Sequence, residues 1–272
     1  MYERLLVPVD GSAFAEEMLP YALGISRATG AGLALLRVVD QGGNHAEASR
    51  YVETLAAEVA AEGLCLASSG DAATTILEEA ARVPGTLVAM TSQGRSGVLE
   101  AVLGSVAMKV LRGGGAPVLV LRPRADRSGS SRDPVKMERI VLPLDGTPRA
   151  EAIAAQAGEV ARWLGARLVV IEVLGPRARV ADGLPGGDVM DSSYVHSRAT
   201  ALGKQYGIEV GWEVLHRAEP ADAIADFVGR DRGTMLAMVT RANVAPLTAA
   251  RLGSVTSACL RKAGAPLLMR LP

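Results

Sequence analysis

The sequence predicts an α/β protein built from two copies of a doubly wound domain. Two observations predict the duplication: the stretch Arg4–Ser12 returns as Arg139–Thr147, and Leu103–Val106 returns as Leu252–Val255. A third observation predicts the fold class, because short, uninterrupted apolar runs alternate with longer amphipathic segments in each copy. Parallel strands covered by helices on both faces have this pattern. The length of 272 residues also suits about two domains.

The repeat sets the expected domain boundaries. We expect a first domain over residues 1–124 and a second over 137–272, and each is long enough to bury its own core. Residues 125–136 are mostly small and polar and show no periodicity, which is typical of a linker.

Each element of the first copy follows from a local signal. Ser12 is a favourable N-cap for a helix that we expect to continue to about Thr29, and Thr147 takes this place in the second copy, with Pro148 at the first helical position. The run Gly113–Gly115 is typical of a helix end and turn. The expected strands are Leu5–Val9, Leu33–Val39, Leu64–Leu66, Thr86–Met90 and Pro117–Leu121. The remaining expected helices are Ala46–Ala61, Ala72–Arg82 and Ser105–Arg112.

The second copy is longer than the first. The offset between the copies is 135 at Asp10 and Asp145 but 149 at Gly104 and Gly253, so 14 residues are inserted between these points. We assign some of them to a Gly- and Pro-rich loop at 175–188 and the rest to a longer third strand at 208–215.

Composition excludes several classes of function. Apolar residues make up 49% and charged residues 21% of the chain, as in ordinary globular proteins. The formal net charge is zero, so nothing favours nucleic acid or an anionic membrane as a partner. No apolar run reaches the ~18 residues of a membrane helix, and the strand pattern starts at Glu3 without a signal peptide. We therefore expect a cytoplasmic protein, in which Cys65 and Cys259 are buried thiols.

Polar and glycine residues follow three of the expected strands. Asp10 ends the first strand, Val38 lies at the end of the second, and the fourth leads into a loop with Gly94 and, nine residues later, Gly104-Ser105. Ligands of open α/β sheets bind beyond these carboxyl ends. Gly94 allows close approach of the backbone, a helix N-terminus at Ser105 suits a phosphate, and Asp10 can accept hydrogen bonds from ribose or an adenine amine. Together these residues predict a nucleotide pocket.

Each signal alone has a simpler interpretation. Ser105 by itself is typical of an N-cap, and Asp10-Gly11 of a plain turn. The loop is neither a P-loop nor a dinucleotide fingerprint. His45, His196 and His216 lack neighbours at metal-ligand spacing, and no serine has a nucleophile-elbow context, so we expect neither a metal site nor a catalytic residue.

These residues resemble the universal stress proteins, here in tandem form. The family pattern is Gly-x2-Gly-x9-Gly-Ser/Thr after the fourth strand, with an Asp closing the first, and Thr91 stands here where the pattern has its first Gly. The resemblance covers nearly the whole chain outside the linker. It implies five-stranded parallel sheets of order 3-2-1-4-5 and binding of ATP, often with a divalent metal such as Mg²⁺.

The resemblance also implies a set of binding residues. The first strand would meet adenine and ribose, the backbone of the second would meet the adenine edge, and the glycine loop would hold ribose and phosphates. The implied residues are Pro8, Val9, Asp10, Val38, Thr91, Gly94, Gly104, Ser105 and Val106.

The second copy departs further from the pattern. Thr240 keeps the count to Gly253-Ser254, but Asn243 then stands at the position of Gly94 and Pro246 at that of Gly97. Asn tolerates a left-handed backbone, yet its side chain occupies space beside the phosphates. Our hypothesis is that the first domain binds ATP, while Asp145, Asn243 and Ser254 form a site that binds it poorly or not at all.

The resemblance favours an ATP-binding stress-response or regulatory protein. The alternatives are a slow ATP hydrolase, for which no base or arginine finger is evident, and a ligand-free interaction module. Because single-domain relatives dimerise through their last strands, we expect Val118–Val120 and Leu267–Met269 to pair within the chain. Whether two chains form a homodimer is left open by the sequence.

Overall fold

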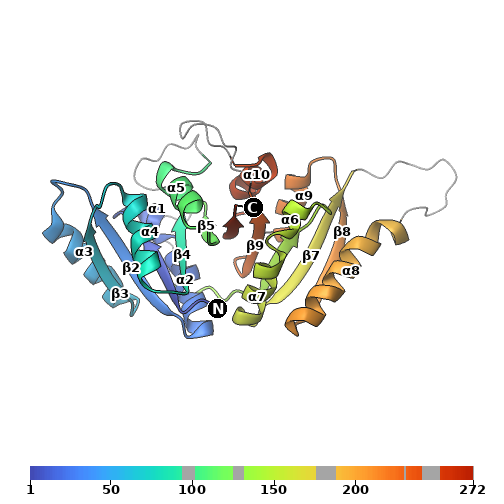
Figure 1. Ribbon diagram of the computed structural model, residues 1–272, viewed down its shortest axis with the longest axis horizontal. Coiled ribbons are helices and arrows are strands. Elements are labelled where there is room, and N and C mark those ends of the chain that lie inside the picture. The colour runs from blue at the N-terminus through green and yellow to red at the C-terminus, as the bar shows by residue number, and fades with distance from the viewer. Residues whose placement is uncertain (94–101, 125–131, 176–187, 230, 241–251, 272) are drawn as a thin grey trace.

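The protein is described by a computed structural model that places residues 1–93, 102–124, 132–175, 188–229, 231–240 and 252–271. Within these residues the strands form one ten-stranded sheet of order β3-β2-β1-β4-β5-β10-β9-β6-β7-β8 (Figure 1). The first half contributes β1 (Arg4–Pro8), β2 (Gly32–Val39), β3 (Glu62–Ala67), β4 (Thr86–Thr91) and β5 (Val118–Leu121). The second contributes β6 (Arg139–Pro143), β7 (Arg167–Leu174), β8 (Val210–His216), β9 (Thr234–Val239) and β10 (Leu267–Arg270).

The predicted fold class is confirmed. Strands within each half are parallel, and both halves have the order 3-2-1-4-5 when counted from their own first strand. The halves meet where β5 and β10 pair antiparallel, with Leu119 opposite Leu268. This pair lies at the centre of the sheet in Figure 1, so β3 and β8 are its outer edges.

Helices cover both faces of the sheet. The first half has α1 (Ala13–Glu16), α2 (Leu19–Thr29), α3 (His45–Glu58), α4 (Ala72–Arg82) and α5 (Ser105–Gly113). The second has α6 (Pro148–Glu151), α7 (Ala154–Leu164), α8 (Asp188–Tyr206), α9 (Pro220–Val228) and α10 (Ser254–Lys262). Buried side chains of α2, α3, α7 and α8 belong to one hydrophobic cluster, and those of α4, α5, α9 and α10 belong to a second.

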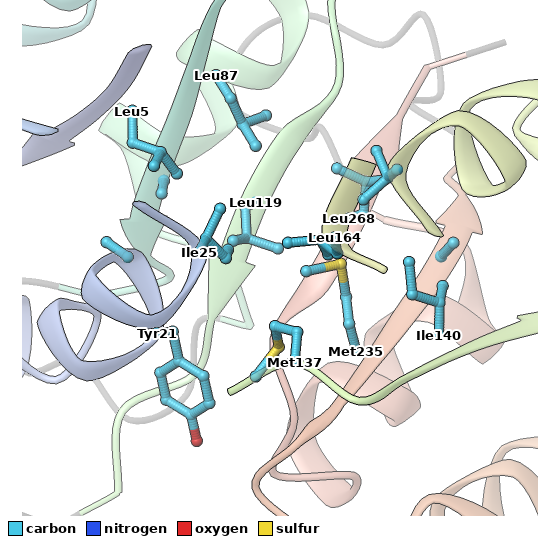
Figure 2. Packing of buried hydrophobic residues seen from close by; sticks show 14 of the residues in the cluster. Leu5, Tyr21, Ile25, Leu87, Leu119, Met137, Ile140, Leu164, Met235 and Leu268 are labelled. Atoms are coloured by element: carbon cyan, nitrogen blue, oxygen red, sulfur yellow. The ribbon is translucent and has the colours of Figure 1, made fainter. Parts of the chain in front are cut away.

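Both hydrophobic clusters run through both halves. Neighbouring residues of a strand alternate between them, so Leu5 joins the first and Leu6 the second, and both are fully buried. This explains why the strands are apolar at every position rather than at every second one. Figure 2 shows the first cluster crossing the centre, where Leu119 and Leu268 lie between Ile25 of one half and residues of the other.

The expected helix from Ser12 to Thr29 is two helices. Ser12 caps the first as predicted, since its Oγ accepts from the Ala15 N–H at 3.2 Å. The chain then turns at Met18 and restarts as α2, and the second half breaks at Ile153 in the same way. Proline is not the shared cause, because only α2 has one in its first turn. The shared feature is a fully buried residue at the break.

The predicted extension of the third strand is wrong. The chain runs 28 residues from Ala34 to its β-sheet partner Glu62, and 42 residues from Leu168 to its partner Val210, a difference of 14. A net 14 residues are therefore inserted before β8. They fall in the segment 176–187, which lies outside the described residues, and in α8, which has 19 residues against 14 in α3.

Several contacts join the halves away from the central strand pair. The Tyr2 ring packs edge-on against Trp163 at 5.5 Å between centroids. The end of the linker lies against α2, where the Val135 N–H donates to the Pro20 carbonyl at 2.8 Å. Gly24 permits this approach, because a Cβ there would lie 1.7 Å from the Val135 carbonyl oxygen.

The two cysteines differ in their surroundings. Cys259 is buried, as predicted, and burial raises its pKa to about 12. Cys65 is only partly buried, which corrects the prediction, because β3 is an edge strand with one side open. Its thiol lies 3.9 Å from the His45 carbonyl oxygen.

Candidate functional site

A cleft of about 290 Å³ opens beyond the carboxyl ends of β1, β2 and β4, between these strands and α5. Most of the residues expected to bind a ligand line this one cleft. They are Pro8, Val9, Asp10, Val38, Thr91, Gly104, Ser105 and Val106. The remaining one, Gly94, falls in the segment 94–101, outside the described residues. We call this the first cleft.

Asp10 is held by the turn that follows β1. Its Oδ1 accepts from the Ser12 N–H at 3.0 Å and from the Ser12 hydroxyl at 2.6 Å. The Ser12 hydroxyl also caps α1, so the carboxylate and the start of the helix are fixed together. Asp10-Gly11 thus forms a turn, as its simpler interpretation has it. This turn also holds the Asp10 carboxylate at the wall of the cleft.

One end of the first cleft is formed by the N-terminus of α5. The interpretation of Ser105 as an N-cap is wrong, because Gly104 is the N-cap and no side chain caps this helix. The Gly104 N–H donates to the Ser92 carbonyl at 2.7 Å, which anchors the helix start to the end of β4. Ser105 is the first helical residue and is exposed. Its hydroxyl and the first amides of α5 can therefore bind an anion together.

Another wall of the first cleft is formed by the end of β2. The Val9 N–H donates to the Leu36 carbonyl at 2.8 Å, and the Ser68 N–H donates to the Val39 carbonyl at 2.8 Å. Alternate residues of a parallel strand bond to opposite neighbours, so the N–H and C=O of Val38 point past the end of β1 into the cleft. This pair can read the edge of a base.

Arg37 is a residue that sequence reasoning missed. Arg37 is among the residues that line the first cleft, and its Nη1 donates to the Val38 carbonyl at 2.9 Å. The guanidinium thus occupies the carbonyl of Val38, whereas the Val38 N–H is not bonded by it. No sequence signal marks this, because an arginine at the end of a strand is ordinarily a solvated side chain.

Beside the first cleft, Glu16 joins three parts of the chain. Its Oε1 accepts from the Tyr51 hydroxyl of α3 at 3.0 Å, and its Oε2 from Arg132 of the linker at 2.7 Å. Burial, and then the charge of Glu16, raise the pKa of Tyr51, so its hydroxyl stays a donor. In the second half Glu151 accepts instead from Tyr194 and Arg198 of α8.

The second half contains an equivalent cleft of about 320 Å³. Asp145 repeats the geometry of Asp10, accepting from the Thr147 N–H at 3.0 Å and its hydroxyl at 2.6 Å. Ser254 is again the first helical residue, after the N-cap Gly253. Val173 lines this second cleft at the place of Val38, and Arg149 lies in its wall.

The strand register corrects how the two glycine loops correspond. Arg4 Nε donates to the Thr86 hydroxyl at 3.1 Å, and Arg139 Nε donates to that of Thr234, also at 3.1 Å. Positions in β4 and β9 therefore differ by 148, one less than the offset at Gly104 and Gly253.

It follows that Thr240 corresponds to Ser92 rather than to Thr91. The Ser92 N–H bonds to the last residue of β5 and the Thr240 N–H to that of β10. The counterpart of Thr91 is Val239, and the loop of the second half is one residue longer. Counted from the strand, Ala242 takes the place of Gly94, whereas counting back from Gly253 gives Asn243. Neither is glycine, and both lie outside the described residues.

The repeated sheet and the two clefts define a tandem doubly wound α/β protein. The pattern of the universal stress protein family matches residues 1–122 and 136–269. The chain therefore belongs to the universal stress protein family. No match to a curated protein was found.

Solved structures share the fold along the whole chain. A universal stress protein from Archaeoglobus fulgidus is 20% identical, with a TM-score of 0.69 over 100% of this chain and 99% of its own. A putative one from Pseudomonas aeruginosa is 17% identical, with a TM-score of 0.62 over 100% of this chain and 94% of its own. Another A. fulgidus protein, solved in complex with dAMP, is 26% identical, with a TM-score of 0.38 over 50% of this chain and 98% of its own.

Across the placed segments, no helix has the length and apolar character needed to cross a membrane.

Proposed function

We propose that this chain is an ATP-binding stress-response or regulatory protein and that the first cleft holds most of the nucleotide. The observation that carries the proposal is the convergence of Asp10, the Val38 main chain and the N-terminus of α5 on one cavity of about 290 Å³. These groups suit a ribose, a base and a phosphate respectively. The dAMP complex is a property of the A. fulgidus protein, and the proposal for this chain rests on its own cleft.

The proposed contacts follow from the geometry. Pro8 and Val9 form an apolar wall for the base, and Asp10 accepts from ribose hydroxyls. Ser105 and the neighbouring amides of α5 bind phosphate, where the helix dipole favours negative charge. Thr91 at the end of β4 and Gly94 in the loop that follows complete the proposed site.

Binding is favoured over hydrolysis by the charges of the cleft. Among the placed residues that line it, Asp10 is the only carboxylate, and its Oδ1 is already bonded to Ser12. A general base would be needed instead near the phosphates, at the opposite end beside Ser105. We therefore propose no catalytic residue.

A divalent cation fits this site as a companion of the nucleotide. In the portion of the chain that is placed, no group of three or more His, Cys, Asp or Glu side chains could hold a metal ion. Mg²⁺ commonly binds through substrate phosphates and keeps several waters. We propose that any Mg²⁺ would be bound by the ATP phosphates rather than by a protein cage.

The second cleft is proposed to bind ATP more weakly. It retains Asp145, Gly253 and Ser254 but has Val239 at the place of Thr91, and neither Ala242 nor Asn243, the two possible counterparts of Gly94, is a glycine. The proposed units are residues 1–124 and 137–272 with the linker 125–136. The antiparallel β5–β10 pair is proposed to serve the chain as an internal counterpart of a dimer contact.

The test compares Ser105→Ala with its matched control Ser254→Ala in the full-length protein. A hydrogen bond to a charged phosphate contributes about 1.5–3 kcal/mol, so we expect Ser105→Ala to weaken ATP binding about tenfold or more. Ser254→Ala should leave the main binding event unchanged. Isothermal titration calorimetry with Mg-ATP measures both affinities.

Equal losses in the two variants would show that both clefts bind ATP alike and would overturn the proposed division. The absence of any ATP binding to the wild-type protein would overturn the proposed function itself. Chromatography of the supernatant from denatured protein gives an independent check, since a tightly held adenine nucleotide would be released.

A further inference from the structure

The main chain at the end of β2 offers one donor and one acceptor to a base. Adenine complements such a pair, because its N1 accepts and its N6 amine donates. In the first cleft the acceptor of this pair is already occupied, because the Arg37 guanidinium donates to the Val38 carbonyl at 2.9 Å. An adenine amine would have to displace a charged donor to reach the same oxygen.

We infer that Arg37 determines the base selectivity of the first cleft, so that the site accepts 6-oxopurine nucleotides about as well as adenine nucleotides. With Arg37 in place, the base-facing end presents two donors, the Val38 N–H and the guanidinium. Two adjacent donors match the O6 and N7 acceptors of a 6-oxopurine, the same edge that arginine reads on guanine. The inference rests on the proposed function, since it names the nucleotide class for the same cleft.

The second cleft provides an internal control for this inference. There the Leu144 N–H donates to the Ile171 carbonyl at 2.8 Å, and the Arg217 N–H donates to the Leu174 carbonyl at 3.0 Å. By the same alternation, the N–H and C=O of Val173 point into the second cleft. The residue at the place of Arg37 is Glu172. A carboxylate accepts hydrogen bonds and cannot cover a carbonyl.

The position of Arg37 is compatible with this role. Its side chain is partly buried and lies close enough to Tyr51 for its charge to oppose the rise in the Tyr51 pKa that burial and Glu16 cause. The Arg37 charge thus lies near Tyr51 of α3, while its Nη1 reaches the Val38 carbonyl. Arg37→Ala is expected to leave the β2 backbone and the Ser105 end of the cleft unchanged.

The experiment measures the ratio of ITP to ATP dissociation constants for the full-length protein. Inosine differs from adenosine only at the 6-position and N1, so the ratio isolates the base edge. For wild type we expect a ratio within about threefold of one. For Arg37→Ala we expect the ratio to rise about tenfold in favour of ATP, the factor that corresponds to one hydrogen bond of ~1.4 kcal/mol. Glu172→Ala, the matched control, should leave the ratio unchanged.

Two results would overturn the inference while leaving ATP binding in place. One is a wild-type protein that already prefers ATP more than tenfold, and the other is an Arg37→Ala variant with an unchanged ratio. A variant that loses affinity for both nucleotides equally would show that Arg37 acts only as a structural residue. If neither nucleotide binds to the wild type, the proposed function fails and this inference fails with it.

Discussion

The two halves of the sheet keep the same backbone but differ in the surroundings of an equivalent arginine, Arg4 or Arg139. In the first half Arg4 is buried and forms an ion pair with Glu79 at 2.9 Å, also donating to the Glu79 carbonyl. In the second half Arg139 is partly exposed and lies over the Phe227 ring, 5.5 Å from its centroid. Both arginines still bond to a threonine at the start of the fourth strand.

The two clefts differ in a comparable way. Each keeps its Asp-containing turn and its helix N-terminus, and a different residue, Arg37 or Glu172, precedes the valine at the end of its second strand. Positions that shape the backbone are thus retained, whereas positions that set charge and hydrogen-bond polarity have diverged. A duplicated fold allows this, because a main-chain turn is required in both copies but a ligand contact is not.

The largest expected effect tests the buried ion pair. Glu79→Leu leaves the Arg4 guanidinium buried without a carboxylate, and breaking such a pair costs about 3–5 kcal/mol of the free energy of unfolding. Phe227→Leu removes only a cation–π contact and some packing, so about 1–2 kcal/mol is expected. Urea unfolding followed by circular dichroism measures both. Equal losses would show that the two arrangements are energetically equivalent.

A smaller effect is expected at high pH from the contact between the halves. Burial, and then the charge of Glu159, raise the pKa of Tyr2 from 10.0 to about 12. Because the folded pKa is the higher one, the folded state keeps its proton longer. Stability is therefore complete below pH 10 and falls as the pH rises toward 12.

Wild type should lose up to about 2 kcal/mol of its free energy of unfolding between pH 10 and pH 12 through Tyr2, and Tyr2→Phe should not show this loss. The measurement is the free energy of unfolding at pH 8 and at several values between 10 and 12, where the variant should show the flatter curve. At pH 8 the two proteins should agree closely. An identical pH dependence in both would mean that Tyr2 does not meet Glu159 and Trp163 of the other half in solution.

The smallest expected effect concerns the linker. Arg132→Ala removes the ion pair with Glu16, and Arg198→Ala removes the equivalent pair with Glu151. Partly exposed pairs of this kind contribute about 0.2–1 kcal/mol and are weakened by salt. Thermal unfolding at low and high salt should show small, similar shifts for both variants. A clearly larger shift for Arg132→Ala would make the linker a structural part of the first half.

Much of the fold could be predicted because its signals are local. The N-caps Ser12 and Thr147 and the helix Ala72–Arg82 follow from residue type and periodicity alone, and the structure has them as expected. The break at Met18 could not be predicted, because the feature that it shares with the break at Ile153, full burial of the residue, emerges only in the folded structure. The insertion was misplaced because residue counting cannot tell which element has lengthened.

The lining of the candidate cleft could be predicted where it depends on Asp10 and Gly104-Ser105, and less so where it depends on strand register. The one-residue shift between Ser92 and Thr240 emerges only when the strands are paired with their neighbours. Arg37 was missed because its significance lies in which carbonyl its side chain reaches. Such contacts are set by the direction of the main-chain groups in the sheet, which residue spacing alone does not reveal.

The antiparallel β5–β10 pair has a consequence for how the molecule responds to a ligand. Since both hydrophobic clusters continue across it, neither half can lose its structure without exposing apolar surface of the other. Binding energy gained in one cleft therefore adds to the unfolding free energy of the whole chain. A nucleotide in the first cleft would protect the second half from local opening and proteolysis, even if that half binds nothing.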